Sequence, residues 1–237
     1  MTNKLTQFTT YNSLLTKSAF TLAETLIVMG IIGVVAALTL PNLNSSTGDK
    51  EKVVKLKKIY SNLNDAMGRA IAVYGPYSDW SSNAEKTGGR LTEFMKLSKD
   101  CGTNSTQTCF VKKFKAVSSG DHLDMDNHTG NYYTFTTADG TSVLFLAKDN
   151  NSDSIIVDID GLNKGTNEAS KDIFKFDVNT ETGEITPHGS TDFSDSLLTC
   201  GCLNNKYLEC TAWAIEHENL DYLKCADKLT ANKTSCK

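Results

Sequence analysis

One acidic side chain, Glu24, interrupts a long apolar run near the start of the sequence, and the chemistry open to it is pairing with a cation. Glu24 is the only ionisable side chain between Ser18 and Gly48. A carboxylate in an apolar environment is costly unless a positive charge lies beside it. Cleavage between Ala19 and Phe20 would supply that charge, because the new α-amine would lie one helical turn from Glu24. Between chains in a helix bundle, the same pair would fix the axial register of the helices.

The element that must position Glu24 is a helix over the 21 residues 20–40. At about 1.5 Å per residue such a helix spans roughly 30 Å, the thickness of a bilayer's hydrocarbon core. Because the run is apolar on all sides, the sequence predicts a single membrane-spanning helix. One alternative is a secretory signal peptide, with basic Lys4 and Lys17 and cleavage near Ala36-Ala37, although the run is long for one. The other is an uncut, single-pass signal anchor for an extracytoplasmic binding domain.

The residues Ser18-Ala19-Phe20-Thr21-Leu22-Ala23-Glu24, followed by the apolar run, resemble the processing site of type IV prepilins and type II secretion pseudopilins. The resemblance implies cleavage between Ala19 and Phe20, N-methylation of Phe20 and a need for Glu24 in assembly. Pro41 matches a helix-kinking proline of that family. The sequence departs from the family at Ala19, where glycine is usual, and its leader of 19 residues is long.

The resemblance also implies a structural role rather than an enzymatic one. The expected protein is a pilin or pseudopilin of a type IV pilus or a type II secretion-like filament, and its size and cysteine-rich tail favour a minor subunit. Implied partners are the prepilin peptidase/methyltransferase, other pilin or pseudopilin subunits, the inner-membrane assembly platform and membrane lipid. The implied location is the bacterial inner membrane, with a single pass and the head outside the cytoplasm, followed by incorporation into a filament.

The rest of the chain predicts an α+β head. Residues 52–74 carry apolar side chains at helical spacing, which favours an amphipathic continuation of the first helix along the head. The polar run 42–48 is expected to melt or kink the helix. A short helix is expected near 91–99, strands at 132–137, 142–147, 154–159 and 172–178, and a partly helical tail over 204–226. The expected fold is therefore a long hydrophobic N-terminal stalk helix with an antiparallel sheet as head, like a pilin.

This organisation divides the chain into four parts. They are a cytoplasmic leader that is removed (1–19), a transmembrane and assembly helix (20–41), the amphipathic continuation (42–75) and an exported head with a cysteine-rich tail (76–237).

Seven cysteines lie outside the apolar run, and five of them fall in the tail. Disulfides persist in exported proteins, so this distribution favours an extracytoplasmic head. Cys101 and Cys109 would close a short loop and form the favoured pair, whereas spacing leaves the others open. A zinc site at Cys200-Gly201-Cys202 is disfavoured by its spacing. The unassigned cysteines are Cys200, Cys202, Cys210, Cys225 and Cys236.

A polar loop follows one predicted strand and offers oxygen ligands of the kind that calcium prefers. It resembles an Asp- and Gly-rich loop of many pilin-like heads, some of which hold calcium, but it is longer and lacks the closing glutamate of an EF-hand, since Ala169 stands there. A strand-connecting turn is the favoured interpretation, with calcium as the alternative. The candidate ligands are Asp158, Asp160, Asn163, Asn167 and Asp172.

Charge and motif content support neither nucleic-acid binding nor catalysis. The net charge is −4 and the sequence pI is about 5.6, whereas nucleic-acid-binding domains usually carry a basic surplus. The sequence lacks the common hydrolase, metalloprotease and phosphate-loop motifs. No contact with nucleic acid, no catalytic residue and no cofactor other than a possible calcium ion is therefore predicted.

Overall fold

A computed structural model describes the backbone of residues 21–103, 107–115, 122–124, 131–147, 152–189, 208–230 and 232–236, without the side chains of residues 38–47, 122–124 and 152. The chain divides into two compact units, Met1–Ser45 and Ser46–Lys237. Helix α1 contributes to both units, and the sheet lies entirely in the second.

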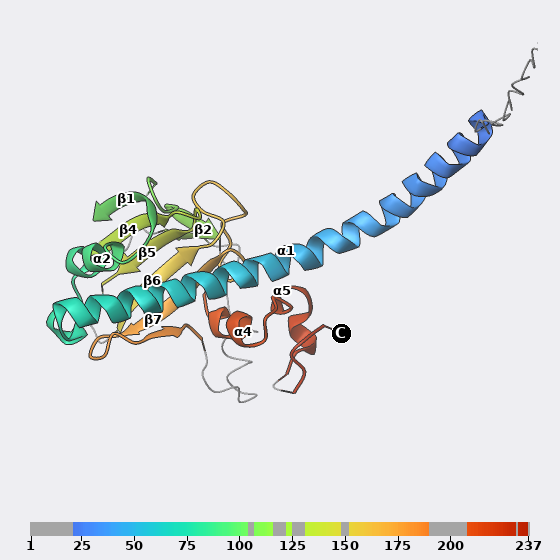
Figure 1. Cartoon of the computed structure of the whole chain (residues 1–237). Helices are drawn as coiled ribbons and strands as arrows, with labels where there is room; N and C mark the ends of the chain where they lie inside the picture. Colours follow the sequence, from blue (N-terminus) through green and yellow to red (C-terminus); the bar gives the residue numbers. More distant parts are fainter. Residues whose placement is uncertain are drawn as a thin grey trace, which may run out of the picture. The chain divides into compact units, whose positions relative to one another are not determined.

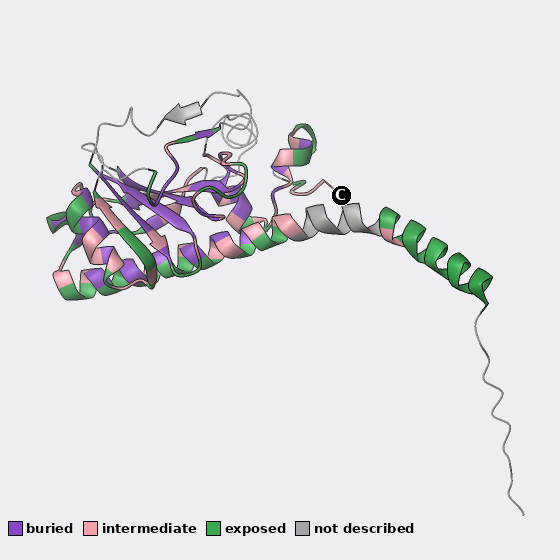
Figure 2. Cartoon of the chain, turned by 90° about the horizontal axis from the view of Figure 1, so that it is seen from above, coloured by how far each residue is buried: buried purple, intermediate pink, exposed green. Residues whose placement is uncertain are grey.

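Helix α1 (Leu22–Tyr74) has 53 residues. From Val53 onward it is amphipathic, because buried apolar residues recur every three or four positions: Val53, Leu56, Ile59, Leu63, Ala66, Met67 and Ala70. Figure 2 shows this alternation of buried and exposed residues along the head, in contrast to the exposed first turns of the helix. The helix ends at Gly75, whose positive φ of 84° suits glycine, and Pro76 follows.

A six-stranded antiparallel sheet, in the order β1-β4-β5-β6-β7-β8, packs against this part of α1 (Figure 1). Its central strands are joined by short connections, which favours antiparallel pairing of neighbours in sequence. The strands are β1 (Leu97–Thr103), β4 (Tyr132–Thr137), β5 (Ser142–Leu146), β6 (Ser152–Asp158), β7 (Ile173–Asn179) and β8 (Ile185–Pro187).

Smaller elements surround the sheet. Helix α2 (Ala84–Thr92) begins at Asn83, whose side chain accepts a hydrogen bond from the backbone N–H of Lys86. Strands β2 (Lys113–Lys115) and β3 (His122–Asp124) form a separate two-stranded sheet. The remaining elements are η1 (Tyr77–Asp79), α4 (Thr211–Glu216), α5 (Tyr222–Cys225) and η3 (Ala226–Lys228).

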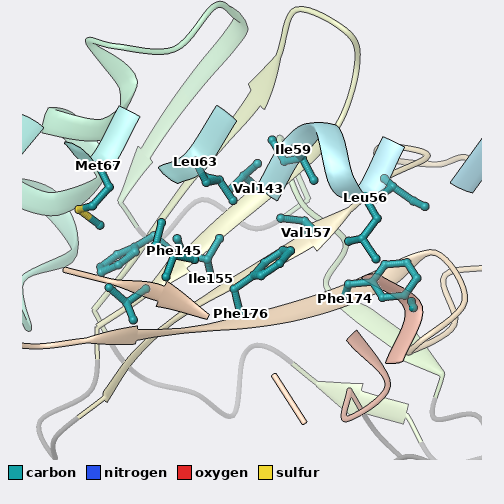
Figure 3. Close-up of a cluster of buried hydrophobic side chains, with 14 of the residues drawn as sticks. Leu56, Ile59, Leu63, Met67, Val143, Phe145, Ile155, Val157, Phe174 and Phe176 are labelled. Carbon is teal, nitrogen blue, oxygen red and sulfur yellow. The ribbon is translucent and has the colours of Figure 1, made fainter. Parts of the chain in front are cut away.

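The main core lies between α1 and one face of the sheet. Figure 3 shows Leu56, Ile59, Leu63 and Met67 of α1 directed at apolar side chains of β5, β6 and β7. Tyr60 stacks on Phe176 with ring centroids 5.2 Å apart. A second apolar cluster, which includes Phe114, Leu144 and Ile156, covers residues of the opposite strand face. All five residues of β5 are therefore buried.

The prediction that the N-terminal part of α1 forms a membrane-spanning stalk is corrected by the structure. In the part of the chain that the structure describes, no helix has both the length and the apolar composition needed to cross a membrane. The apolar run does not end at a helix boundary. Instead, the backbone stays helical through Pro41 and residues 42–48 and continues into a charged, amphipathic stretch. The expectation that residues 42–48 melt is also wrong, whereas a kink at Pro41 stays a prediction.

The described head is an α+β arrangement of an antiparallel sheet and helices, and β4, β5, β6 and β7 lie within two residues of the predicted strand bounds. The helix predicted over 91–99 is wrong, because α2 ends at Thr92 and β1 begins at Leu97. Strand β1 was not predicted because its composition is polar, and an edge strand needs little apolar surface. The tail contains α4 and α5, both short helices, in its described part.

Candidate functional site

The start of α1 is organised around Glu24. Thr21 precedes the helix, and its Oγ1 accepts a hydrogen bond from the backbone N–H of Glu24 (3.2 Å). In return, Glu24 Oε2 accepts bonds from the Thr21 backbone N–H (2.9 Å) and hydroxyl (2.8 Å). This reciprocal arrangement is a capping box, and the acid at the helix N-terminus also complements the helix dipole. The sequence signal was present as Thr21-x-x-Glu24 but was overlooked.

The capping box gives Glu24 a local role, but it does not use the whole carboxylate. Oε2 makes both bonds to Thr21. Within the described residues, Oε1 has no hydrogen-bond partner, and the side chain is exposed. A cation from outside these residues could therefore approach Oε1 without disturbing the helix start.

The turns that follow Glu24 expose large apolar side chains on every side of the helix. Leu22 is 80% exposed, and the large apolar residues that follow it, as far as Val35, are each more than half exposed. The exposed set in this region is Leu22, Leu26, Ile27, Val28, Met29, Ile31, Ile32, Val34 and Val35. Soluble monomers rarely expose contiguous apolar surface on this scale, so these turns indicate a surface that a partner or lipid covers. The processing residues Ala19 and Phe20 lie outside the described residues.

The polar loop between β6 and β7 is organised by Asp172. Asp172 Oδ2 accepts bonds from the backbone N–H groups of Thr166 (2.8 Å) and Asn167 (3.0 Å), and Oδ1 accepts one from Glu168 (2.6 Å). Gly165, with a φ of +68°, lets the chain pass this carboxylate, since a Cβ there would lie 2.7 Å from Asp172 Oδ2. Asp172 therefore acts as the fixed centre of a turn.

The other candidate calcium ligands have different surroundings. Asp160 pairs with Lys52 (3.6 Å) and Lys55 (3.5 Å) of α1, which ties the loop to the helix. Asn163 is exposed. Asp158 Oδ2 and Asn167 Oδ1 are buried without a hydrogen-bond partner. Among the described residues, no three His, Cys, Asp or Glu side chains form a group that could hold a metal ion. The loop thus brings Asp160 and Asp172 together around Gly165, whereas Asn163 is exposed.

Burial raises the pKa of Asp158 to about 7, despite hydrogen bonds from the backbone N–H groups of Gly161 and Asp160. Because the folded-state pKa is above the unfolded one, this group favours folding below about pH 4. That contribution is lost as the pH rises through 7. We expect Asp158→Asn to abolish this loss and to raise the unfolding midpoint at pH 8. One pKa unit corresponds to about 1.4 kcal/mol, so the gain can reach a few kcal/mol.

Thermal unfolding of both proteins between pH 4 and pH 8 measures this effect, with the exposed Asp79→Asn as the matched control. An unchanged pH slope in Asp158→Asn would contradict the assignment. If the substitution instead lowered the midpoint at pH 8 in calcium but not in EDTA, calcium would be the partner of the Asp158 carboxylate.

Two disulfides hold described parts of the chain. Cys101–Cys109, the pair that the sequence favoured, joins β1 to the following loop, with a Cα–Cα distance of 6.1 Å. Cys225–Cys236 closes the tail at 5.8 Å. Cys210 is also disulfide-bonded. Cys200 and Cys202 lie outside the described residues.

A polar cluster on β7 and just after β8 was not found from the sequence. His188 Nδ1 lies 2.5 Å from Asp177 Oδ2, and Lys175 Nζ lies 3.2 Å from Asp177 Oδ1. Burial opposes ionisation of Asp177, but the hydrogen bond from His188 and the nearby positive charges outweigh it and lower the pKa of Asp177. The cluster links residues 11 apart in sequence through strand pairing, which no local motif could reveal.

Comparison of this chain with protein-family models, with curated proteins and with solved structures finds no match.

Proposed function

We propose that the chain is a structural subunit, a pilin or pseudopilin, of a type IV pilus or type II secretion-like filament. In this proposal a prepilin-type peptidase cuts between Ala19 and Phe20 and methylates the new amine. The subunit is held at the bacterial inner membrane until the assembly platform adds it to a filament of related subunits. The head lies outside the cytoplasm and carries no catalytic site.

The exposed apolar turns of α1 carry this proposal. Burial of this apolar surface away from water is favourable, and the equivalent helices of other subunits can bury it. The surface includes Leu22, Leu26 and Ile27. The same helix continues into the amphipathic part that packs on the sheet. The same element would thus supply both the assembly surface and a packing face of the head.

The capping box is compatible with processing. Cleavage before Phe20 leaves Thr21 and its backbone N–H in place, so the hydrogen bonds to Glu24 Oε2 can persist. The new amine would begin one residue before the cap, and Glu24 Oε1 offers the anion for an amine of the same or a neighbouring chain. The two disulfides support an oxidising location for the head.

Mass spectrometry of the mature N-terminus tests the proposal. We expect N-methylated Phe20 as the first residue of the protein purified from a host that has a prepilin peptidase, and an intact leader when that peptidase is deleted. An intact Met1 in both hosts would contradict the proposal and support an uncut anchor. Cleavage near Ala36-Ala37 would instead indicate a secretory signal peptide.

A further inference from the structure

A groove of about 440 Å³ lies on the head between the exposed side of α1, the segment that precedes β1 and the β4–β5 turn. Phe94 and Met95, both half-buried, provide its apolar lining. Its walls carry two neutral ion pairs: Lys58 with Asp139 (2.7 Å) and Arg69 with Asp65 (3.0 Å). The groove therefore combines apolar contact with charges that already neutralise one another.

Lys96 gives this region a positive charge that no carboxylate of the described residues pairs with. It lines the groove and is exposed, and Lys99 follows it on the outer edge strand β1. Within the described residues, neither ammonium group has a carboxylate partner, unlike Lys58 and Arg69. Lys96 lines the groove with the half-buried Phe94, and Lys99 adds a second positive charge on the adjoining strand, which suits an acidic protein segment.

The turn between β7 and β8 is an acidic segment of this kind. Glu181 and Glu184 are exposed, and within the described residues neither carboxylate has a cationic partner. The turn is ordered by its own bonds, because Asn179 Oδ1 accepts from the Glu181 N–H (2.9 Å) and Thr182 Oγ1 accepts from the Glu184 N–H (3.2 Å). Gly183, with a φ of +74°, packs this turn closely against Ile71 and Tyr77.

The Lys96 end of the groove and the acidic turn lie at diagonally opposite corners of one sheet. Strand β1 forms one edge and β8 the other, as Figure 1 shows for the order of β1 to β7. Leu97 pairs with Thr137 beside the β4–β5 turn, whereas Asn179 pairs with Ser152 at the opposite end of the strands. Within one molecule, strands β4 to β7 therefore separate the β1 edge from β8 and the acidic turn.

We propose that the acidic turn of one copy, with Glu181 and Glu184, docks into the Lys96–Lys99 side of the groove of the next copy. This inference rests on the proposed filament function and names the contact between heads. Because the groove and the turn are two different surfaces, the proposed contact is head-to-tail and leaves one of each free at the ends. Repeated from copy to copy, such a contact propagates along a filament.

Charge reversal in the full-length chain tests this contact. One variant reverses the groove (Lys96→Glu with Lys99→Glu), and the other reverses the turn (Glu181→Lys with Glu184→Lys). Two differently tagged copies are co-purified in mild detergent at low salt. Each variant is expected to self-associate about tenfold less than the unchanged chain, because like charges then face each other. Mixing the two variants is expected to restore association, since each groove again meets a turn of opposite charge.

Lys228→Glu with Lys233→Glu is the matched control for the groove variant, because it changes the net charge equally on exposed tail residues. Absence of co-purification between unchanged copies, or failure of the mixed variants to recover, would overturn the contact. If the reversals had no effect while Glu24→Gln still blocked incorporation into filaments, the contact would be wrong and the proposed function would stand. If the charge pattern held but the leader stayed uncut, the contact would stand and the pilin function would not.

Discussion

Glu24→Gln is expected to leave the chain processed and folded but to reduce its incorporation into filaments by about tenfold or more. Glutamine can occupy the same position of a capping box and accept the Thr21 N–H bond, so the helix start is retained. The amide cannot neutralise the Phe20 amine. An unpaired charge among apolar helices costs about 3–5 kcal/mol, which exceeds a tenfold change in equilibrium. Quantifying the subunit in purified filaments, relative to its total cellular amount, measures the effect.

Thr21→Ala is the matched control, because it removes the cap and keeps the charge. Losing the Thr21 hydroxyl deletes its bonds to Glu24 and costs about 1 kcal/mol of helix stability. We expect processing and incorporation close to those of the unchanged chain. The reverse pattern, with Glu24→Gln assembling normally and Thr21→Ala failing, would mean that Glu24 acts only as a helix cap.

These two variants test the role of Glu24, which lies in the region where the sequence-based prediction and the structure differ most. The isolated acid predicted a charge pair, but the described residues supply a second, local reason for Glu24 in the bonds with Thr21. The length of the apolar run predicted a membrane span, which the described helices do not contain. In the structure α1 continues for more than 30 residues beyond Pro41, so the apolar run and the amphipathic stretch belong to one helix.

The head was more predictable where burial is periodic. The amphipathic part of α1 and strands β4 to β7 follow from apolar spacing, because α1 packs on one face of these strands and a second apolar cluster covers the other face. Strand β1 was mistaken for a helix because its side chains are mostly exposed or half-buried and its pairing with β4 is irregular. The Asp177–His188 contact and the groove depend on strand register, which the sequence does not encode locally.

Leu63→Ala is expected to destabilise the head by about 2–5 kcal/mol. Leu63 is fully buried on α1, and Figure 3 shows it beside Val143 in the layer between the helix and the sheet. Truncating a buried leucine removes its transfer free energy and leaves a cavity that a close-packed core closes only in part. Denaturant unfolding of the disulfide-intact chain, followed by the fluorescence of the buried Trp80 and Trp213, measures the loss.

Val54→Ala provides the matched control on the same helix, because Val54 is 65% exposed and its truncation should change stability by about 0.5 kcal/mol or less. Equal effects of the two substitutions would contradict the packing of α1 on the sheet.

The expected difference has a functional consequence, since α1 is the element through which the head would be joined to the assembly surface. A head that is loosened at Leu63 while Glu24 is intact should still be processed at Ala19/Phe20. A defect confined to the stability of the head would therefore separate the helix's packing role from its role in assembly.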